Sequence, residues 1–160
     1  EPKTPLKDIM SKEAVYFLFA LTLGSGVSRQ ISDLLNKDDR LYGYLFDLVC
    51  SIGIEAFADD IIKRFFDREV SRGRLKDNDV MLRYSPGYCG WHITGQKMLH
   101  ENLQSKDIGI TLTEAFYMKP IKSISGVIIG SNPSMHDFKN DYPFCVDCRT
   151  QTCRKRLQTV

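Results

Sequence analysis

The segment Arg83-Tyr84-Ser85-Pro86-Gly87-Tyr88-Cys89-Gly90-Trp91 carries the most structural information in this sequence. Its Ser-Pro-Gly centre ends any regular element and has little side-chain bulk, so the backbone is open to a neighbouring molecule. Three aromatic residues and an arginine surround that centre. One interpretation is an ordinary Pro-Gly turn whose aromatic side chains pack on the core. The other is a small-molecule site for an anionic or carboxylate-bearing ligand, which the arginine would bind.

The chain before this segment predicts a strand and two helices. Residues 15–23 are rich in β-branched and aromatic side chains and predict a buried strand. Ser25 or Ser28 can then cap a short helix that ends near residue 35. Beyond it, apolar residues at steps of three and four predict a long helix over 38–70.

Two residues of the long helix are unusual. Gly53 costs about 1 kcal/mol relative to Ala, which predicts either a bend or a close approach to the helix backbone. Glu55 continues an apolar stripe, where a carboxylate would be desolvated and would need a cation or several donors. It either is solvated or paired with an arginine, or accepts hydrogen bonds from a ligand. The stripe consists of Leu41, Leu45, Leu48 and Ile52.

The remaining elements alternate between strand and helix. A turn at 77–79 leads into an extended stretch over 80–84, and a further helix is expected over 94–104. Strand-forming residues then predict three strands, at 109–113, 116–118 and 123–129, with a turn at Lys119-Pro120. The fold class expected is α+β, in one domain.

Composition excludes several classes of protein. The 160 residues balance 22 Lys and Arg against 20 Asp and Glu, and a net charge of +2 is too small for a nucleic-acid partner. The longest apolar run, 14–23, is about half of a membrane span and has no basic segment before it, so we expect a soluble protein. Five cysteines, three of them within the last 16 residues, favour a reducing, cytoplasmic location over a disulfide framework.

A cysteine cluster near the end of the chain could bind a metal. Cys145, Cys148 and Cys153 include a C-x-x-C pair, which can bring two thiolates onto one ion. Zinc or an iron–sulfur cluster, free thiols, and disulfides all remain open. A closed tetrahedral site would need a fourth ligand, for which the candidates are Cys50, Cys89, His92 and His136.

Four motifs stand in one order along the chain: Glu55-Ala56-Phe57-Ala58, Arg83-x-x-Pro86-Gly87-Tyr88, Leu112-Thr113-Glu114-Ala115-Phe116-x-Met118-x-Pro120 and Ser123-x-Ser125-Gly126. Each motif is weak by itself, but the combination is specific. Over roughly residues 15–135 the sequence resembles the reactivation domain of cobalamin-dependent methionine synthase, here as a stand-alone protein. In that family the domain binds S-adenosylmethionine.

The resemblance implies a role for each residue of the site. Arg83 would bind the carboxylate of S-adenosylmethionine, and Tyr88 would lie at the reacting centre near the methyl group, where cobalamin approaches. Glu55 would contact the same ligand. Four residues would touch the nucleoside through their backbone: Tyr84, Ser85, Pro86 and Gly87.

The resemblance also implies a fold and partners. The fold would be a curved, mainly antiparallel sheet with flanking helices, forming a domain over 1–135. The chain's own composition adds a cysteine-containing tail over 136–160. The partner would be a corrinoid-binding protein or domain of a methyltransferase, with a flavodoxin-type protein as a possible electron donor. The domain would position the methyl group and exclude water during reductive remethylation of the corrinoid.

The chain departs from the family pattern at three places. An aspartate of the family's ligand site has no clear counterpart, and Ser51 replaces an acidic residue one helical turn before Glu55. The cysteine tail is also absent from that pattern, and no corrinoid-binding module is attached, so a separate corrinoid protein is expected. The alternative functions are a redox module with a metal cluster on its tail, and a non-catalytic domain that interacts with a corrinoid protein.

Overall fold

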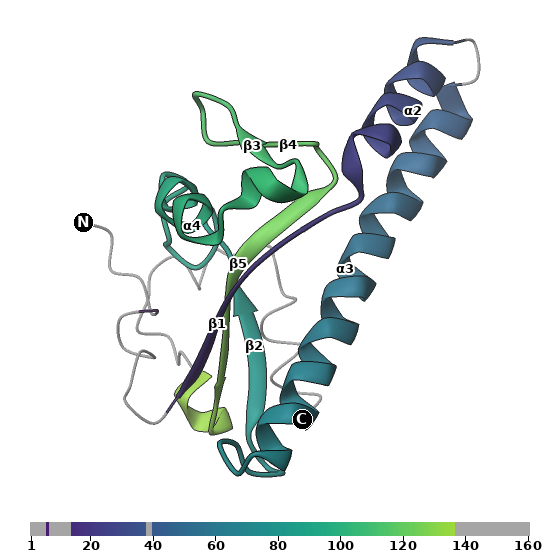
Figure 1. Cartoon of the computed structure of the whole chain (residues 1–160). Coiled ribbons are helices and arrows are strands. Elements are labelled where there is room, and N and C mark those ends of the chain that lie inside the picture. Colours follow the sequence, from purple (N-terminus) through teal and green to yellow (C-terminus); the bar gives the residue numbers. More distant parts are fainter. Residues whose placement is uncertain (1–5, 7–13, 38–39, 137–160) are drawn as a thin grey trace. The chain divides into compact units, whose positions relative to one another are not determined.

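The computed structural model describes residue 6 and residues 14–37 and 40–136 (Figure 1). These residues form two compact units. The first unit gathers the described residues of 1–17, 62–93 and 127–160, and the second gathers those of 18–61 and 94–126. Three elements contribute to both units: strand β1 (Val15–Thr22), helix α3 (Arg40–Ser71) and strand β5 (Ser123–Ser131).

The main sheet has three strands in the order β1-β5-β2 (Figure 1). Strand β2 (Val80–Tyr84) runs antiparallel to β5, and this pairing sets Arg83 opposite Ile128 and Tyr84 opposite Val127. A separate two-stranded ladder pairs β3 (Thr111–Leu112) with β4 (Met118–Lys119). With helices alongside an antiparallel sheet, the expected α+β class is confirmed.

The first unit is built around the β2–β5 pair. Helix α3 ends before Gly73, whose φ of 68° lies in the left-handed region and reverses the chain direction. The expected turn at 77–79 follows: the Asp79 N–H donates to the Lys76 carbonyl at 3.0 Å. Tyr84 and Ile129 form the buried centre of this unit, with half-buried Trp91 packed against them.

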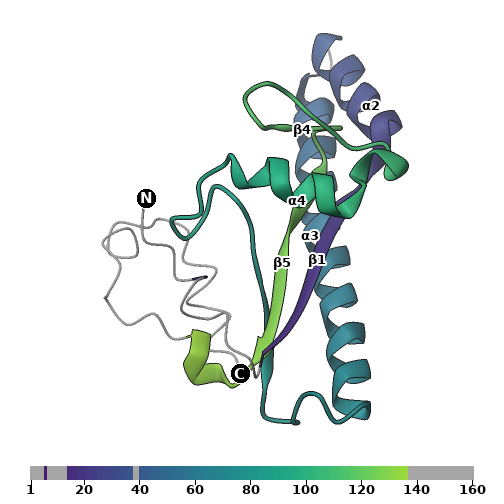
Figure 2. The ribbon, with the colours of Figure 1, turned by 60° about the vertical axis from the view of Figure 1, so that its left-hand side comes forward.

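The second unit holds the remaining helices. Helix α2 (Gly24–Asn36) runs beside the first part of α3 (Figure 1), so closely that a Cβ on Gly43 would lie 2.9 Å from the backbone nitrogen of Leu35. Helix α4 (Gly95–Leu103) lies beside the start of β5 (Figure 2), because Ser125 Oγ donates to Gln96 Oε1 at 2.7 Å.

Most predicted elements are confirmed, but the predicted helix cap is wrong. Helix α2 begins at Gly24, and the residue before it makes no side-chain cap hydrogen bond. Instead, the Gly24 N–H donates to Thr22 Oγ1 at 3.0 Å, which places Ser25 and Ser28 inside the helix. Thr22, at the end of β1, therefore supplies the side-chain acceptor that a serine was predicted to supply.

The long helix is confirmed as α3, but it buries a different face from the one predicted. Leu41 and Ile52 of the expected stripe are 67% and 60% exposed, and Leu45 and Leu48 are exposed as well. The buried positions are Cys50, Ile54, Ala58 and Glu69. Both sets recur at helical steps, so the period alone could not choose between the two faces.

Gly53 of α3 has open space beside it, with no atom within 4 Å of a Cβ built there. Of the two alternatives predicted for this residue, a bend or a close approach, the second is therefore not seen among the described residues. Although α3 is long, no helix among the described residues is both long and apolar enough to cross a membrane.

Candidate functional site

The loop between β2 and α4 has a backbone shape fixed by its own hydrogen bonds. The Gly87 N–H donates to the Trp91 carbonyl at 2.7 Å, the Tyr88 N–H donates to Ser85 at 3.1 Å, and the Trp91 N–H donates to Tyr88 at 2.9 Å. The predicted turn is thereby confirmed. Because these three N–H groups are already used, a ligand here would meet other groups, such as carbonyl oxygens with a second lone pair.

Three residues of this loop have left-handed backbone conformations. Gly87 has a φ of 95°, Cys89 of 50° and Gly90 of 68°. Glycine adopts such angles freely, whereas a residue with a Cβ adopts them at a cost. At Gly87 the conformation itself demands glycine, since a Cβ would only reach van der Waals distance of Ile93 Cδ1, at 3.5 Å.

The side chains of the loop divide into anchors and exposed groups. Tyr84 and Pro86 are buried, Arg83 and Ser85 are half-buried, and Gly87 is exposed. Tyr88 is 57% exposed, so its phenol is accessible. Both interpretations of the sequence are therefore met in part: Tyr84 and Trp91 pack in the core, while Tyr88 and part of Arg83 face outward.

The hydroxyl group of Tyr84 belongs to a buried polar network. That hydroxyl lies 2.7 Å from Nδ1 of His136, and Nε2 of that ring lies 3.0 Å from Ser131 Oγ. His136 ends the 3-10 helix η2 (Pro133–His136) and is fully buried. Desolvation by burial lowers the pKa of His136 from 6.5 to about 4, so the ring is neutral at pH 7.

We did not predict this network from the sequence, where His136 was only a candidate fourth ligand to a metal. Both ring nitrogens of His136 are engaged by hydroxyl groups, so neither is available to a metal. A histidine after Asn132-Pro133 gives no local sign of burial. Ser131 is close to it in the chain, but Tyr84 lies on the distant strand β2, and only the tertiary fold reveals that contact.

Glu55 lies on α3 in the second unit and is exposed, so the prediction of a desolvated carboxylate at this position is wrong. It lies next to Ile54, which is only 3% exposed, and one step around a helix moves a side chain off the buried face. That Glu55 contacts a ligand stays a prediction from the family resemblance.

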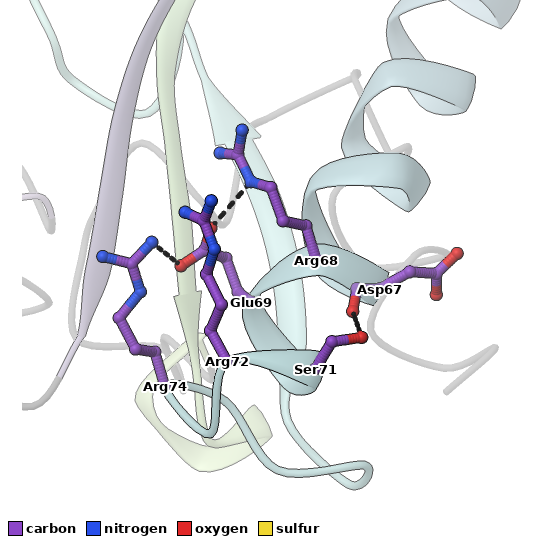
Figure 3. Close-up of polar contacts among 6 residues, drawn as sticks. All are labelled: Asp67, Arg68, Glu69, Ser71, Arg72 and Arg74. Atoms are coloured by element: carbon purple, nitrogen blue, oxygen red, sulfur yellow. Dashed lines mark hydrogen bonds and ion pairs between the residues drawn. The ribbon is translucent and has the colours of Figure 1, made fainter.

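The buried carboxylate of α3 is Glu69, with 0% side-chain exposure (Figure 3). Arg68 Nε donates to its Oε1 at 3.0 Å, and Arg74 Nη2 lies 2.5 Å from its Oε2. Arg72 completes the group at 4.0 Å. Arginines at 68, 72 and 74 were the signal in the sequence that could have identified this residue.

Ser51, which replaces an acidic residue of the family pattern, has a structural partner. Lys122 Nζ donates to Ser51 Oγ at 2.7 Å, and Ser51 Oγ donates to the Asp47 carbonyl at 3.0 Å. The same Lys122 Nζ lies 2.8 Å from Asp47 Oδ1. Ser51 is therefore one member of a polar group that joins the residue before β5 to α3 within the second unit.

The cysteines divide between the described and undescribed parts of the chain. Cys145, Cys148 and Cys153 lie outside the described residues, and their metal site stays a prediction. Cys50 is buried and Cys89 half-buried. Within the ranges that the structure describes, no three His, Cys, Asp or Glu side chains are grouped to hold a metal ion.

The fold and the loop define a class of protein: an α+β domain whose antiparallel sheet presents a fixed loop, with an arginine and a phenol, at the end of one strand. Residues 3–141 match the family described as vitamin B12 dependent methionine synthase, activation domain, and the chain belongs to that family. The resemblance seen in the four motifs is thereby confirmed. No curated protein matches the chain.

Proposed function

We propose that this protein binds S-adenosylmethionine and supports the reductive remethylation of the corrinoid of a cobalamin-dependent methyltransferase such as methionine synthase. Membership of the activation-domain family supports a role in cobalamin reactivation. The observation that carries the finer proposal is the Arg83–Tyr88 segment, in which a half-buried arginine on β2 is followed by a hydrogen-bonded turn with an exposed phenol.

The groups of the loop fit the chemistry of this ligand. A guanidinium binds a carboxylate through two parallel hydrogen bonds, and half-burial of Arg83 strengthens them by excluding some water. Gly87 leaves the turn without side-chain bulk, which gives a nucleoside access to the backbone. The donors of Gly87 and Tyr88 are engaged internally, so Ser85 and Gly87 would contribute mainly through carbonyl oxygens.

Within this proposal the chain acts by binding and orientation. When bound, S-adenosylmethionine supplies a methyl group for transfer to the reduced corrinoid of the partner. Arg83 fixes the amino-acid end of the ligand, and exposed Tyr88 lies where the partner would approach and limits the access of water. Glu55 is the proposed second contact to the ligand.

Isothermal titration with S-adenosylmethionine tests the proposal. Wild type should bind, and Arg83→Ala should weaken binding by about 10- to 100-fold, as expected for hydrogen bonds to a charged group. Arg72→Ala is the matched control, because it removes the same charge from a 57% exposed side chain of the same unit. Absence of binding by wild type, or equal binding by Arg83→Ala, would contradict the proposal.

The partner and the reductant are also proposed. A corrinoid-binding protein carrying oxidised cobalamin, mixed with this chain, a reductant such as flavodoxin and S-adenosylmethionine, should regain the absorbance of methylcobalamin. The same mixture without this protein is the control and should not regain that absorbance. A truncated chain that ends at residue 141 retains His136 and tests whether the cysteine tail is needed.

A further inference from the structure

The network beneath the ligand loop joins three separate elements. Tyr84 ends β2, Ser131 ends β5, and His136 ends η2. All three side chains are buried, and the hydrogen bonds that link them, at 2.7 and 3.0 Å, have good lengths. The rings of Tyr84 and His136 are also nearly parallel, at an interplanar angle of 7°.

The network can be satisfied with a neutral imidazole. A neutral imidazole has one donor and one acceptor nitrogen. If the Tyr84 hydroxyl donates to Nδ1 of His136, then Nε2–H donates to Ser131 Oγ. The Ser131 hydroxyl can in turn donate to the Asn132 carbonyl, 3.5 Å away. Each buried hydroxyl and ring nitrogen then has a partner, as buried polar groups require.

Tyr84 transmits this constraint to the loop in two ways. Successive side chains of a strand point to opposite faces, so fixing Tyr84 on one face fixes the direction in which Arg83 leaves the other. Cys89 and Trp91, on the returning limb of the loop, pack against the cluster that contains Tyr84. Both limbs of the loop therefore meet the buried cluster of which Tyr84 is a member.

We infer that His136 is a positioning residue for the ligand loop: by holding the Tyr84 hydroxyl, it sets the direction in which Arg83 leaves the sheet. The inference rests on the proposed function, since it concerns affinity for S-adenosylmethionine. It assigns His136 a role that no feature of the activation-domain motifs contains.

Two variants test the inference by titration with S-adenosylmethionine. Tyr84→Phe removes one hydroxyl and keeps the ring, and His136→Phe removes the partner of that hydroxyl. Each should raise the Kd by about fivefold or more, as expected when a binding group is less well oriented. If His136→Phe does not fold, Tyr84→Phe alone decides. An unchanged Kd in a folded Tyr84→Phe would overturn the inference.

A matched network in the second unit supplies the control. There His100 Nδ1 lies 2.6 Å from Ser105 Oγ, in a buried pair of the same chemistry. Ser105→Ala should lower stability as Tyr84→Phe does, measured by urea unfolding, but should leave the Kd unchanged. If Ser105→Ala raises the Kd equally, the effect of Tyr84→Phe is general destabilisation and the inference fails.

A double-mutant cycle separates positioning from simple support of the fold. If Tyr84 acts through Arg83, Tyr84→Phe should have little further effect on the Kd in an Arg83→Ala background. Full additivity would overturn the inference. Failure of wild type to bind contradicts the proposed function itself, whereas binding that depends on Arg83 but not on Tyr84 or His136 contradicts only the positioning role.

Discussion

Lys122 and Asp47 form an ion pair, with Nζ 2.8 Å from Oδ1, that joins the residue before β5 to helix α3. The lysine side chain is only 12% exposed, so its charge is largely removed from water. Ser51 takes a second hydrogen bond from the same ammonium group. The serine that replaces an acidic residue of the family pattern thus helps to hold a lysine.

Replacing this lysine should destabilise the protein. Lys122→Met keeps the length of the side chain but leaves Asp47 and Ser51 without their donor, at an expected cost of about 1–3 kcal/mol. Urea unfolding measures the change. Lys97→Met, at an exposed position of α4, is the control and should change stability by less than about 0.5 kcal/mol. Equal stabilities for the two variants would contradict this account of the ion pair.

Two glycines of α3 should respond in opposite ways to alanine. Gly53→Ala enters open space and should stabilise the protein by about 0.5–1 kcal/mol through helix propensity. Gly43→Ala gains the same propensity but forces a Cβ against the Leu35 backbone, which should cost about 1–3 kcal/mol. Thermal unfolding of both variants checks the signs. A stabilising Gly43→Ala would show that α2 moves away freely.

Removing the buried charge of Glu69 should be costly. In Glu69→Gln three partly exposed arginines remain around a neutral amide, and the loss of hydrogen bonds to a charged group should cost about 1–3 kcal/mol. Asp67→Asn, at an exposed position two residues earlier, is the control and should stay within about 0.5 kcal/mol of wild type. Chemical denaturation distinguishes the two, and a mild effect of Glu69→Gln would mean that solvent reaches the cluster.

Stability should fall with acidification because of His136. Its pKa is lowered to about 4 in the folded protein, so between pH 6.5 and 4 the unfolded chain binds a proton that the folded chain does not. The stabilisation is complete above pH 6.5 and declines by about 3 kcal/mol as the pH falls to 4. His136→Phe should lose this part of the pH dependence, which urea unfolding at several pH values would reveal.

Burial also lowers the pKa of His100, so some acid sensitivity should remain in His136→Phe. The difference between wild type and the variant isolates His136. Identical pH profiles for the two proteins would contradict the assignment of the slope to this residue.

Local sequence signals predicted the elements and the turn well. Ser-Pro-Gly after an extended stretch fixes the end of β2, and helical steps over some thirty residues fix α3, because both depend on neighbours in the chain. The buried face of α3 could not be predicted, since Leu41 to Ile52 and Cys50 to Ala58 follow the same period. Contacts with other elements select one face.

Only part of the candidate site could be predicted, because local sequence signals do not show contacts between distant residues. The loop and its arginine were identified from their own residues and from the family motifs. Its support was not, because the Tyr84–His136 pair joins residues that are distant in the sequence. Glu55 seemed buried only because the wrong face of α3 had been assigned to the core.

The way the first unit is assembled affects how the protein is made. Its β2 strand pairs with β5, and the hydroxyl of Tyr84 is held by His136, near the end of the described chain. During synthesis Tyr84 therefore leaves the ribosome well before β5 and His136, with which it pairs. The buried centre of the first unit cannot form until these residues have been translated, so folding of this unit should come late in synthesis.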